Sequence, residues 1–214
     1  MTDQQATVEE VESGGKRRER RDAVENRQRL LAEAKKLFAR QGASETSMHE
    51  IARAAGVGQG TLYRHFADKG ELCHALIRED LAEFRERIGA LLADRIRFPS
   101  PLGRLELLIR EKNQLTESHL PLFAVMAEES AKPGKKGPFR GPFHTWLRDQ
   151  ITALLEEATA LGETGDLDIG FTADALLAAV APHLYSYQRQ ELGYTRERIN
   201  VAMQRLFVDG LRLK

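Results

Sequence analysis

The chain has 214 residues, of which 42% are hydrophobic and 30% are charged, and its 32 basic and 32 acidic residues give a formal net charge of zero. This composition is typical of a globular protein with a buried core. The single cysteine, Cys73, excludes an internal disulfide and argues against a structural zinc site, so we expect a reducing, cytoplasmic location. No apolar run approaches the roughly 18 residues that span a bilayer, and residues 1–15 lack the apolar segment of a secretory signal. We therefore expect no membrane association.

The first 22 residues are expected to form a disordered N-terminal arm. Residues 1–12 hold four acidic and no basic side chains, and Lys16–Arg21 (KRRERR) then holds five basic side chains and one acidic one. Such a segment is either a solvated tail or a basic arm that lies on DNA, in which Arg17 and Arg18 contact phosphates.

From Ala23 onward the apolar residues recur at helical spacing. A first helix is expected to end at Gly42, a residue type that commonly follows a helix C-terminus. Ser47 and Glu50 have the spacing of a capping box at the start of a short second helix. Gly56 ends this helix, and a short third helix follows in which Leu62 and Phe66 point inward.

The rest of the chain is also predicted to be helical. Asp68 caps a long fourth helix, and Pro99 to Pro101 ends it. Fifth and sixth helices precede a glycine- and proline-rich loop at 131–142, and a seventh helix precedes a turn at 162–170. Two final helices are expected over 171–190 and 195–213, with a kink at Pro182. No segment alternates at period two, so the predicted fold class is all-α.

The most informative segment is SMHEIARAAGVGQGTLYRHFADKGEL, residues 47–72. Two short helices joined by a glycine-containing turn are typical of a helix-turn-helix, and the small residues Ala52 and Ala55 allow the helices to pack closely. Residues 16–70 hold 13 basic and 7 acidic side chains, a net charge of +6 that the neutral total hides. This distribution favours contact with nucleic acid.

This segment resembles the DNA-binding signature of TetR-family transcriptional regulators. The matching residues are Ile51-Ala52, Ala55-Gly56-Val57, Thr61-Leu62-Tyr63-Arg64-His65-Phe66 and Lys69-Gly70-Glu71-Leu72. The resemblance covers about a quarter of the chain. It implies a helix-turn-helix DNA-binding domain at 23–68 and a helical effector-binding and dimerisation domain at 69–214. One departure from the family pattern is Gly58, which stands where Ser or Thr often caps the third helix.

The resemblance also implies contacts with DNA. Gln59 and Arg64 are the candidates for base edges, since glutamine pairs with adenine and arginine with guanine in the major groove. Gly60 and Thr61 would also face the groove. The residues expected to contact phosphates are Ser47, Tyr63, His65 and Lys69.

In the second domain, polar and aromatic residues stand among apolar ones. Each fits a hydrophobic core, and as a set they suit a pocket for a small apolar or aromatic effector. These residues are His119, Phe123, Met126, Phe143, His144, Trp146, His183 and Tyr187. The last two helices carry apolar stripes that fit either an internal hairpin or, as in the family, a homodimer interface. The interface candidates are Leu176, Ala179, Val180, Leu184, Ile199, Met203, Leu206, Phe207 and Gly210.

No enzyme signature is present. The glycines of Gly56-Val57-Gly58-Gln59-Gly60 lack the preceding strand of a phosphate-binding loop, and no two histidines have the spacing of a helical metal site. We expect no catalytic residues, metal or cofactor. The resemblance to TetR-family regulators thus implies a homodimeric repressor that a small molecule releases from an inverted-repeat operator. The alternatives are an activator, a DNA-binding dimer without an effector, and a helical-bundle enzyme or interaction module. The sequence leaves open the effector, the operator, the regulated genes and the number of dimers on each operator.

Overall fold

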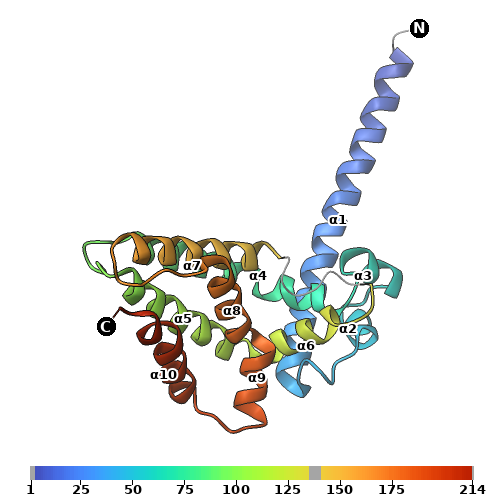
Figure 1. The fold of residues 1–214 in the computed structure, drawn as a ribbon. Coiled ribbons are helices and arrows are strands. Elements are labelled where there is room, and N and C mark those ends of the chain that lie inside the picture. The colour runs from blue at the N-terminus through green and yellow to red at the C-terminus, as the bar shows by residue number, and fades with distance from the viewer. Residues whose placement is uncertain (1–2, 135–140, 214) are drawn as a thin grey trace. The chain divides into compact units, whose positions relative to one another are not determined.

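The computed structural model describes the backbone of residues 3–134 and 141–213, and side chains from Arg21 onward. Within these ranges the elements are helices, with one isolated β-bridge between Thr164 and Arg212, which confirms the expected all-α fold class. The chain divides into two compact units, Met1–Leu76 and Ile77–Lys214 (Figure 1). None of the described helices is long and apolar enough to cross a membrane.

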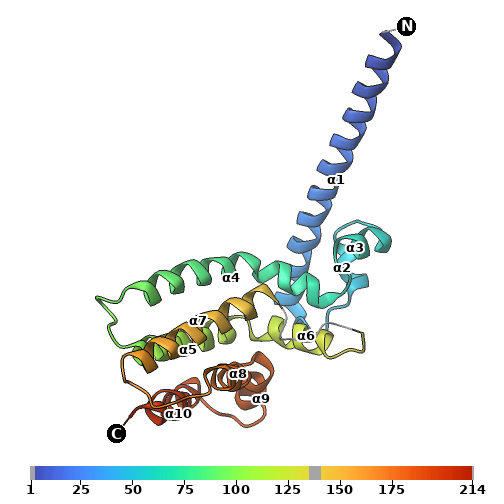
Figure 2. The same cartoon turned by 45° about the horizontal axis from the view of Figure 1, so that its top comes forward.

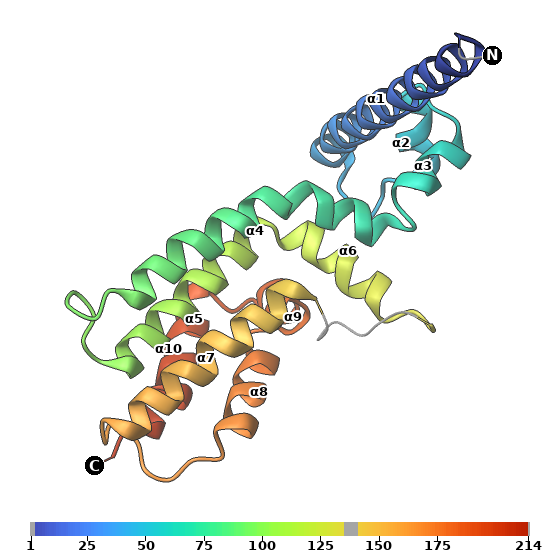
Figure 3. The ribbon, with the colours of Figure 1, turned by 90° about the horizontal axis from the view of Figure 1, so that it is seen from above.

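The first unit holds α1 (Asp3–Gln41), α2 (Met48–Ala54), α3 (Gln59–His65) and the start of α4 (Lys69–Ala93). Figures 1 and 2 show α2 and α3 beside the C-terminal part of α1, Figure 3 shows the same three helices from above, and α2 contacts both α1 and α3. Their apolar faces enclose a small core, formed by Leu30, Ala34, Leu37, Ile51, Ala52, Ala55, Leu62, Phe66 and Leu72.

The N-terminal segment differs from the unfolded arm expected for residues 1–22, because α1 is helical from Asp3. Residues 3–41 contain no proline to interrupt the helix, and Arg21 and Glu25, one turn apart, form an ion pair of 3.6 Å. Arg17 and Arg18 lie outside the residues whose side chains are described, so their expected contact with phosphates stays a prediction.

The boundary between the units falls inside α4, between Leu76 and Ile77, rather than between Asp68 and Lys69 as expected. Leu72 is fully buried in the core of the first unit. Ile77, little more than one turn later, packs with Leu81 and Phe123 of the second unit. A helix that contributes to two cores has a continuous apolar pattern, so its sequence alone does not mark the boundary.

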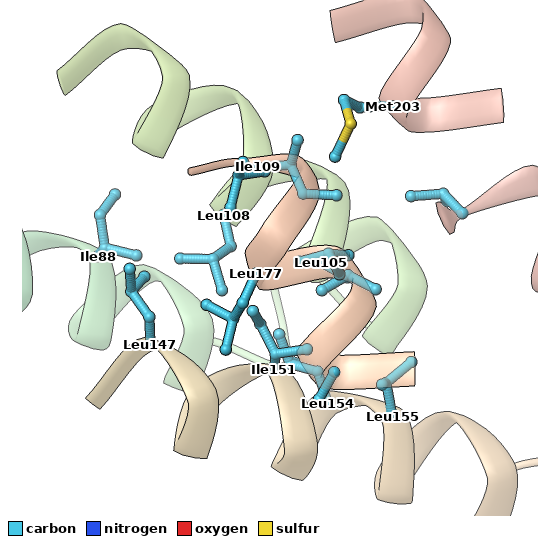
Figure 4. Close-up of a cluster of buried hydrophobic side chains, with 14 of the residues drawn as sticks. Ile88, Leu105, Leu108, Ile109, Leu147, Ile151, Leu154, Leu155, Leu177 and Met203 are labelled. Atoms are coloured by element: carbon cyan, nitrogen blue, oxygen red, sulfur yellow. The ribbon is translucent and has the colours of Figure 1, made fainter. Parts of the chain in front are cut away.

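The second unit continues with α5 (Pro101–Ser118), α6 (Leu120–Ser130), α7 (Pro142–Ala160), α8 (Ile169–Ala179), α9 (Pro182–Gln190), α10 (Arg196–Phe207) and the short 3₁₀ helix η2 (Asp209–Leu211). Helix α7 packs against α5 and α8, α6 packs against α9, and α10 packs against α5 (Figure 2). Figure 4 shows the aliphatic core between these helices, to which α5 contributes Leu105, Leu108 and Ile109.

The last two predicted helices are each interrupted. The segment 171–190 forms α8 and α9 rather than one kinked helix, because Pro182 lacks the N–H that would continue α8 and instead occupies the first turn of α9. Val180 and Ala181 lie between the two helices. The segment 195–213 ends its α-helix at Phe207 and continues as η2.

Candidate functional site

The start of α2 is fixed by the capping box that the sequence predicts. The Oγ atom of Ser47 accepts a hydrogen bond of 3.2 Å from the backbone N–H of Glu50, and the backbone N–H of Ser47 donates one of 2.8 Å to the Glu50 carboxylate. The hydrogen bonds from Ser47 lower the pKa of Glu50. The Ser47 hydroxyl therefore orders the loop before the helix-turn-helix while its side chain stays exposed.

The turn between α2 and α3 depends on Gly56, whose φ of +65° lies in the left-handed region that favours glycine. Helix α3 then begins after Gly58, which makes no side-chain capping hydrogen bond. The weaker cap predicted from this departure is confirmed. The first turn of α3 thus keeps backbone N–H groups available to a partner.

The outer face of α3 presents the polar residues predicted to read DNA. Gln59 and Arg64 are exposed, Tyr63 is 53% exposed, and Leu62 on the opposite side is fully buried. Thr61 is half-buried and accepts a hydrogen bond of 3.0 Å from Nη2 of Arg64. The structure therefore brings an amide, a phenol and a guanidinium together on one helical surface.

Two further residues belong to this surface. His65 is half-buried, and burial together with the nearby Arg27 and Arg64 lowers its pKa, which favours the neutral ring. Gly60 is exposed, and a Cβ atom there would meet no protein atom within 4 Å. The fold itself therefore does not require a glycine at position 60, whereas a close approach of a partner would favour one.

His49 is a residue of this surface that sequence reasoning missed. It lies exposed on α2, and its Nδ1 atom contacts the side-chain amide of Gln59 on α3. The sequence shows His49 only as a histidine without a metal-binding spacing. Its contact with Gln59 depends on the angle between α2 and α3, which a spacing of ten residues does not reveal.

Lys69, whose expected contact with a phosphate stays a prediction, is bound within the protein. Its Nζ atom donates to the backbone carbonyls of Ala43, Ser44 and Thr46 at distances of 3.0, 2.8 and 3.1 Å. A lysine ammonium has three N–H donors, so all of them are engaged within the protein. Lys69 therefore joins the start of α4 to the loop that precedes α2, a role that local sequence does not indicate.

The predicted effector residues divide into three groups. Phe123, Met126 and Phe143 gather around Ile77 and Leu81, and Phe143 also stacks on Trp146 with a ring-centroid distance of 6.0 Å. His183 and Tyr187 are exposed on α9. The third group is polar: His119 lies 3.2 Å from Asp80, and half-buried His144 has a lowered pKa because of its burial.

The predicted dimer residues are only partly at the surface. Four of them are buried in the core of the second unit, so their assignment to the dimer interface is wrong: Leu176, Val180, Ile199 and Met203. The apolar stripe of an amphipathic helix does not reveal whether the same chain or a partner covers it. Leu206 is 67% exposed and Gly210 is exposed, whereas Ala179, Leu184 and Phe207 are half-buried. The described residues also form a shallow groove along α10, lined by Thr195, Glu197, Arg198, Val201, Ala202 and Arg205.

The sequence of the first unit has known relatives. The family described as "Bacterial regulatory proteins, tetR family" matches residues 30–76. HTH-type transcriptional regulators of Staphylococcus aureus are 52% identical to this chain over 65 residues, which are 30% of this chain and 35% of the relatives. The chain therefore matches about a third of the length of these relatives.

Solved structures resemble nearly the whole chain. FadR of Thermus thermophilus, a TetR-family repressor in complex with lauroyl-CoA, has a TM-score of 0.66 and 24% identity, covering 88% of this chain and 96% of that one. FadR of Bacillus subtilis in complex with stearoyl-CoA has a TM-score of 0.63 and 19% identity, covering 86% and 99%. A gamma-butyrolactone receptor has a TM-score of 0.54 and 26% identity, covering 89% and 90%.

Proposed function

We propose that the chain is a cytoplasmic repressor of the TetR family that binds an inverted-repeat operator as a homodimer and leaves it when a small molecule occupies the second unit. The observation that carries the proposal is the outer face of α3, where Gln59, Tyr63 and Arg64 are exposed above a buried Leu62. A short helix with such a face fits the major groove, where base edges differ between sequences.

On this proposal each residue of the surface has a distinct task. Gln59 and Arg64 read base edges, while Tyr63, Ser47 and the N–H groups at the start of α3 contact phosphates. Gly60 allows the backbone to approach the groove. His65 acts as a neutral hydrogen-bonding group, since its pKa is lowered. A dimer places two such helices about 34 Å apart, or a multiple of that distance, and so requires an inverted repeat.

For the homodimer we propose contacts through the outward sides of α8, α9 and α10. Exposed apolar side chains on these helices support this proposal: Leu206 is 67% exposed, Phe171 73% and Tyr187 44%. The groove on α10 is lined by Val201 and Ala202 together with the charged residues Glu197, Arg198 and Arg205. Apolar side chains combined with charged ones are the usual composition of a protein interface.

For the effector we propose a small apolar or aromatic molecule that enters the second unit near Phe123, Met126, Phe143 and Trp146. The gathering of these side chains supports this assignment, as do the acyl-CoA complexes of the two FadR structures. The effector would favour a state that misfits the operator, with a coupling free energy of about 1–3 kcal/mol, the usual size for two linked sites.

The decisive experiment is fluorescence anisotropy of the full-length protein on labelled DNA that flanks its own gene, with scrambled DNA as the competitor, at about 150 mM salt. We expect specific binding in the nanomolar range that resists the competitor. Tyr63→Ala should abolish it, whereas Leu161→Ala, which also truncates an exposed side chain, should leave it unchanged.

The outcome that contradicts the proposal is equal, weak binding to both DNAs, followed by failure to select a preferred site from random sequences. Loss of binding in both Tyr63→Ala and Leu161→Ala would show damage to the protein rather than loss of a contact. Release by an effector is then measured on the same operator by adding candidate ligands to the bound complex.

A further inference from the structure

Helix α5 buries three polar side chains within little more than one turn. Lys112, Asn113 and Thr116 are 4%, 1% and 0% exposed. Figure 4 shows Leu108 and Ile109, one turn earlier, directed toward Leu177 and Met203. Residues four apart lie on one face of a helix, so Lys112 and Asn113 continue the two rows that Leu108 and Ile109 begin. Polar groups therefore occupy positions where the preceding turn has aliphatic ones.

Lys112 reaches the break between α8 and α9. Its Nζ atom donates a hydrogen bond to the Val180 carbonyl, and a second of 2.9 Å to Oγ1 of Thr116. Thr116 in turn donates to the backbone carbonyl of Lys112 at 2.9 Å. Because Val180 lies between the two helices, its carbonyl is outside both helical hydrogen-bond ladders. The lysine thus holds the point where Pro182 interrupts the chain.

Two cationic side chains among the described residues of the second unit are buried, and they have different partners. Arg104 is 2% exposed, and its Nη2 atom lies 2.7 Å from the Glu157 carboxylate. Among the described residues no carboxylate forms an ion pair with Lys112, although its burial is nearly the same. Glu117, the next acidic residue of α5, is engaged by Arg189 and Tyr185. Burial lowers the pKa of Lys112 to about 7, because a charged amine loses its hydration there.

Asn113 provides an independent sign of incomplete polar pairing on this face of α5. Its Nδ2 atom donates to Asn200 on α10 at 2.9 Å, while its buried Oδ1 atom has no hydrogen-bond partner among the described residues. Buried polar atoms in native proteins usually have hydrogen-bond partners. An exception therefore indicates either a partner outside the protein chain or a functional role.

We propose that Lys112 is the anchor for an anionic aliphatic effector, whose carboxylate pairs with the ammonium and whose hydrocarbon part packs among the aliphatic side chains beside α5. This inference rests on the proposed function, because it places the charged end of the proposed effector. In a low-dielectric interior the attraction between a carboxylate and an ammonium is far stronger than it is at the surface. It would also compete with Val180 for Lys112 and so act directly on the break between α8 and α9.

The test compares octanoate with 1-octanol, which share a chain length and differ in charge, on the full-length protein at pH 7. Binding is measured by isothermal titration calorimetry and by the shift in melting temperature. Octanoate should bind wild-type protein about tenfold or more tightly than 1-octanol. Lys112→Met should weaken octanoate binding about tenfold or more and leave 1-octanol binding within about twofold. Lys132→Met, at a 58% exposed lysine, is the matched control and should change neither.

Equal affinities of the wild-type protein for the two ligands, no binding of octanoate at millimolar concentration, or unchanged octanoate binding in Lys112→Met would each overturn the proposal. The comparison on wild-type protein needs no variant, so it decides even if Lys112→Met does not fold. Anisotropy on the operator separates the two proposals. If octanoate binds through Lys112 without releasing DNA, the anchor holds and the proposed release fails. If neutral ligands release DNA from both wild-type protein and Lys112→Met, the proposed release by an effector is supported and the proposed role of Lys112 is wrong.

Discussion

The two units place their functional groups in opposite ways. In the first unit Gln59, Tyr63 and Arg64 lie on the surface, above a cluster of buried apolar side chains. In the second unit a lysine, an asparagine and a threonine are buried among leucines and isoleucines. A surface that meets DNA can be read from local spacing, because its support is two short helices and a turn. The role of a polar group inside a helical bundle depends on contacts with residues far away in sequence.

The largest expected effect tests whether the two units are separate cooperative structures. Leu62→Ala truncates a fully buried side chain of the first unit and should destabilise that unit by about 2–5 kcal/mol. Leu154→Ala should do the same to the second unit, where Leu154 is 5% exposed. Differential scanning calorimetry should show each variant lowering a different transition. A single transition that both variants lower equally would contradict the division.

The next effect concerns the ion pair between α5 and α9. Arg189 and Tyr185 hydrogen-bond to the Glu117 carboxylate, and the Arg189 bonds are the main cause of lowering its pKa to about 2. The unfolded chain binds this proton near pH 4.5, so the stabilisation is present above that value and is lost as the pH falls toward 2.

Glu117→Gln should therefore destabilise the protein at pH 7 by about 1.5–3 kcal/mol, the range for hydrogen bonds to charged groups, and flatten the stability profile between pH 5 and about 2. Urea unfolding at a series of pH values measures this. Glu191→Gln, at an exposed position of the same region, is the control and should keep the wild-type slope. A profile for Glu117→Gln that parallels the wild type would show that this carboxylate is not the titrating group.

The third prediction concerns how the outer face of α3 recognises the base sequence of DNA. Arg64→Ala should weaken binding to the operator by about 1–3 kcal/mol and relax the preference at one base pair in each half-site. Arg78→Ala removes the same charge from an exposed position of α4 and should leave the preference intact. Binding to operators with single base-pair substitutions measures the sequence preference. If Arg64→Ala keeps the full preference, Arg64 does not contact a base edge.

The smallest expected effect distinguishes two roles for Lys69. Lys69→Met removes the hydrogen bonds to the three carbonyls and should lower the stability of the first unit by about 1–2 kcal/mol. The dependence of DNA affinity on salt concentration should stay unchanged. A slope smaller by about one phosphate contact would instead restore the role that the family pattern implies. Lys36→Met, at an exposed position of α1, is the matched control.

Predictions based on local chemistry were confirmed. The capping box of Ser47 and Glu50, the turn at Gly42 and the weak cap at Gly58 all depend on residues within one or two turns of one another. The exposed face of α3 follows from helical periodicity once Leu62 is placed inward. These features need no information about the rest of the chain, which explains why a short motif was sufficient.

Predictions that depended on packing partners were less accurate. Leu176 and Leu206 look alike as members of apolar stripes, yet one is buried in the core and the other is 67% exposed. Lys69 looks like a phosphate ligand but donates to three carbonyls of a loop more than twenty residues earlier. Pro182 was expected to kink one continuous helix, whereas the structure has two helices there, α8 and α9, and Lys112 from α5 donates to the carbonyl of Val180 between them.

The sequence by itself therefore determined the all-helical fold class, the helix-turn-helix and the residues on its outer face. Helix periodicity, caps and turns are interactions between near neighbours, and they are complete within a short segment. Only the tertiary structure decided which apolar stripes form the core, where α4 passes from one unit to the other, and that no carboxylate of the described residues forms an ion pair with the buried Lys112. The physical reason is that the burial and the ion pairing of a side chain depend on contacts between helices. The sequence of one helix does not show which other helix it packs against.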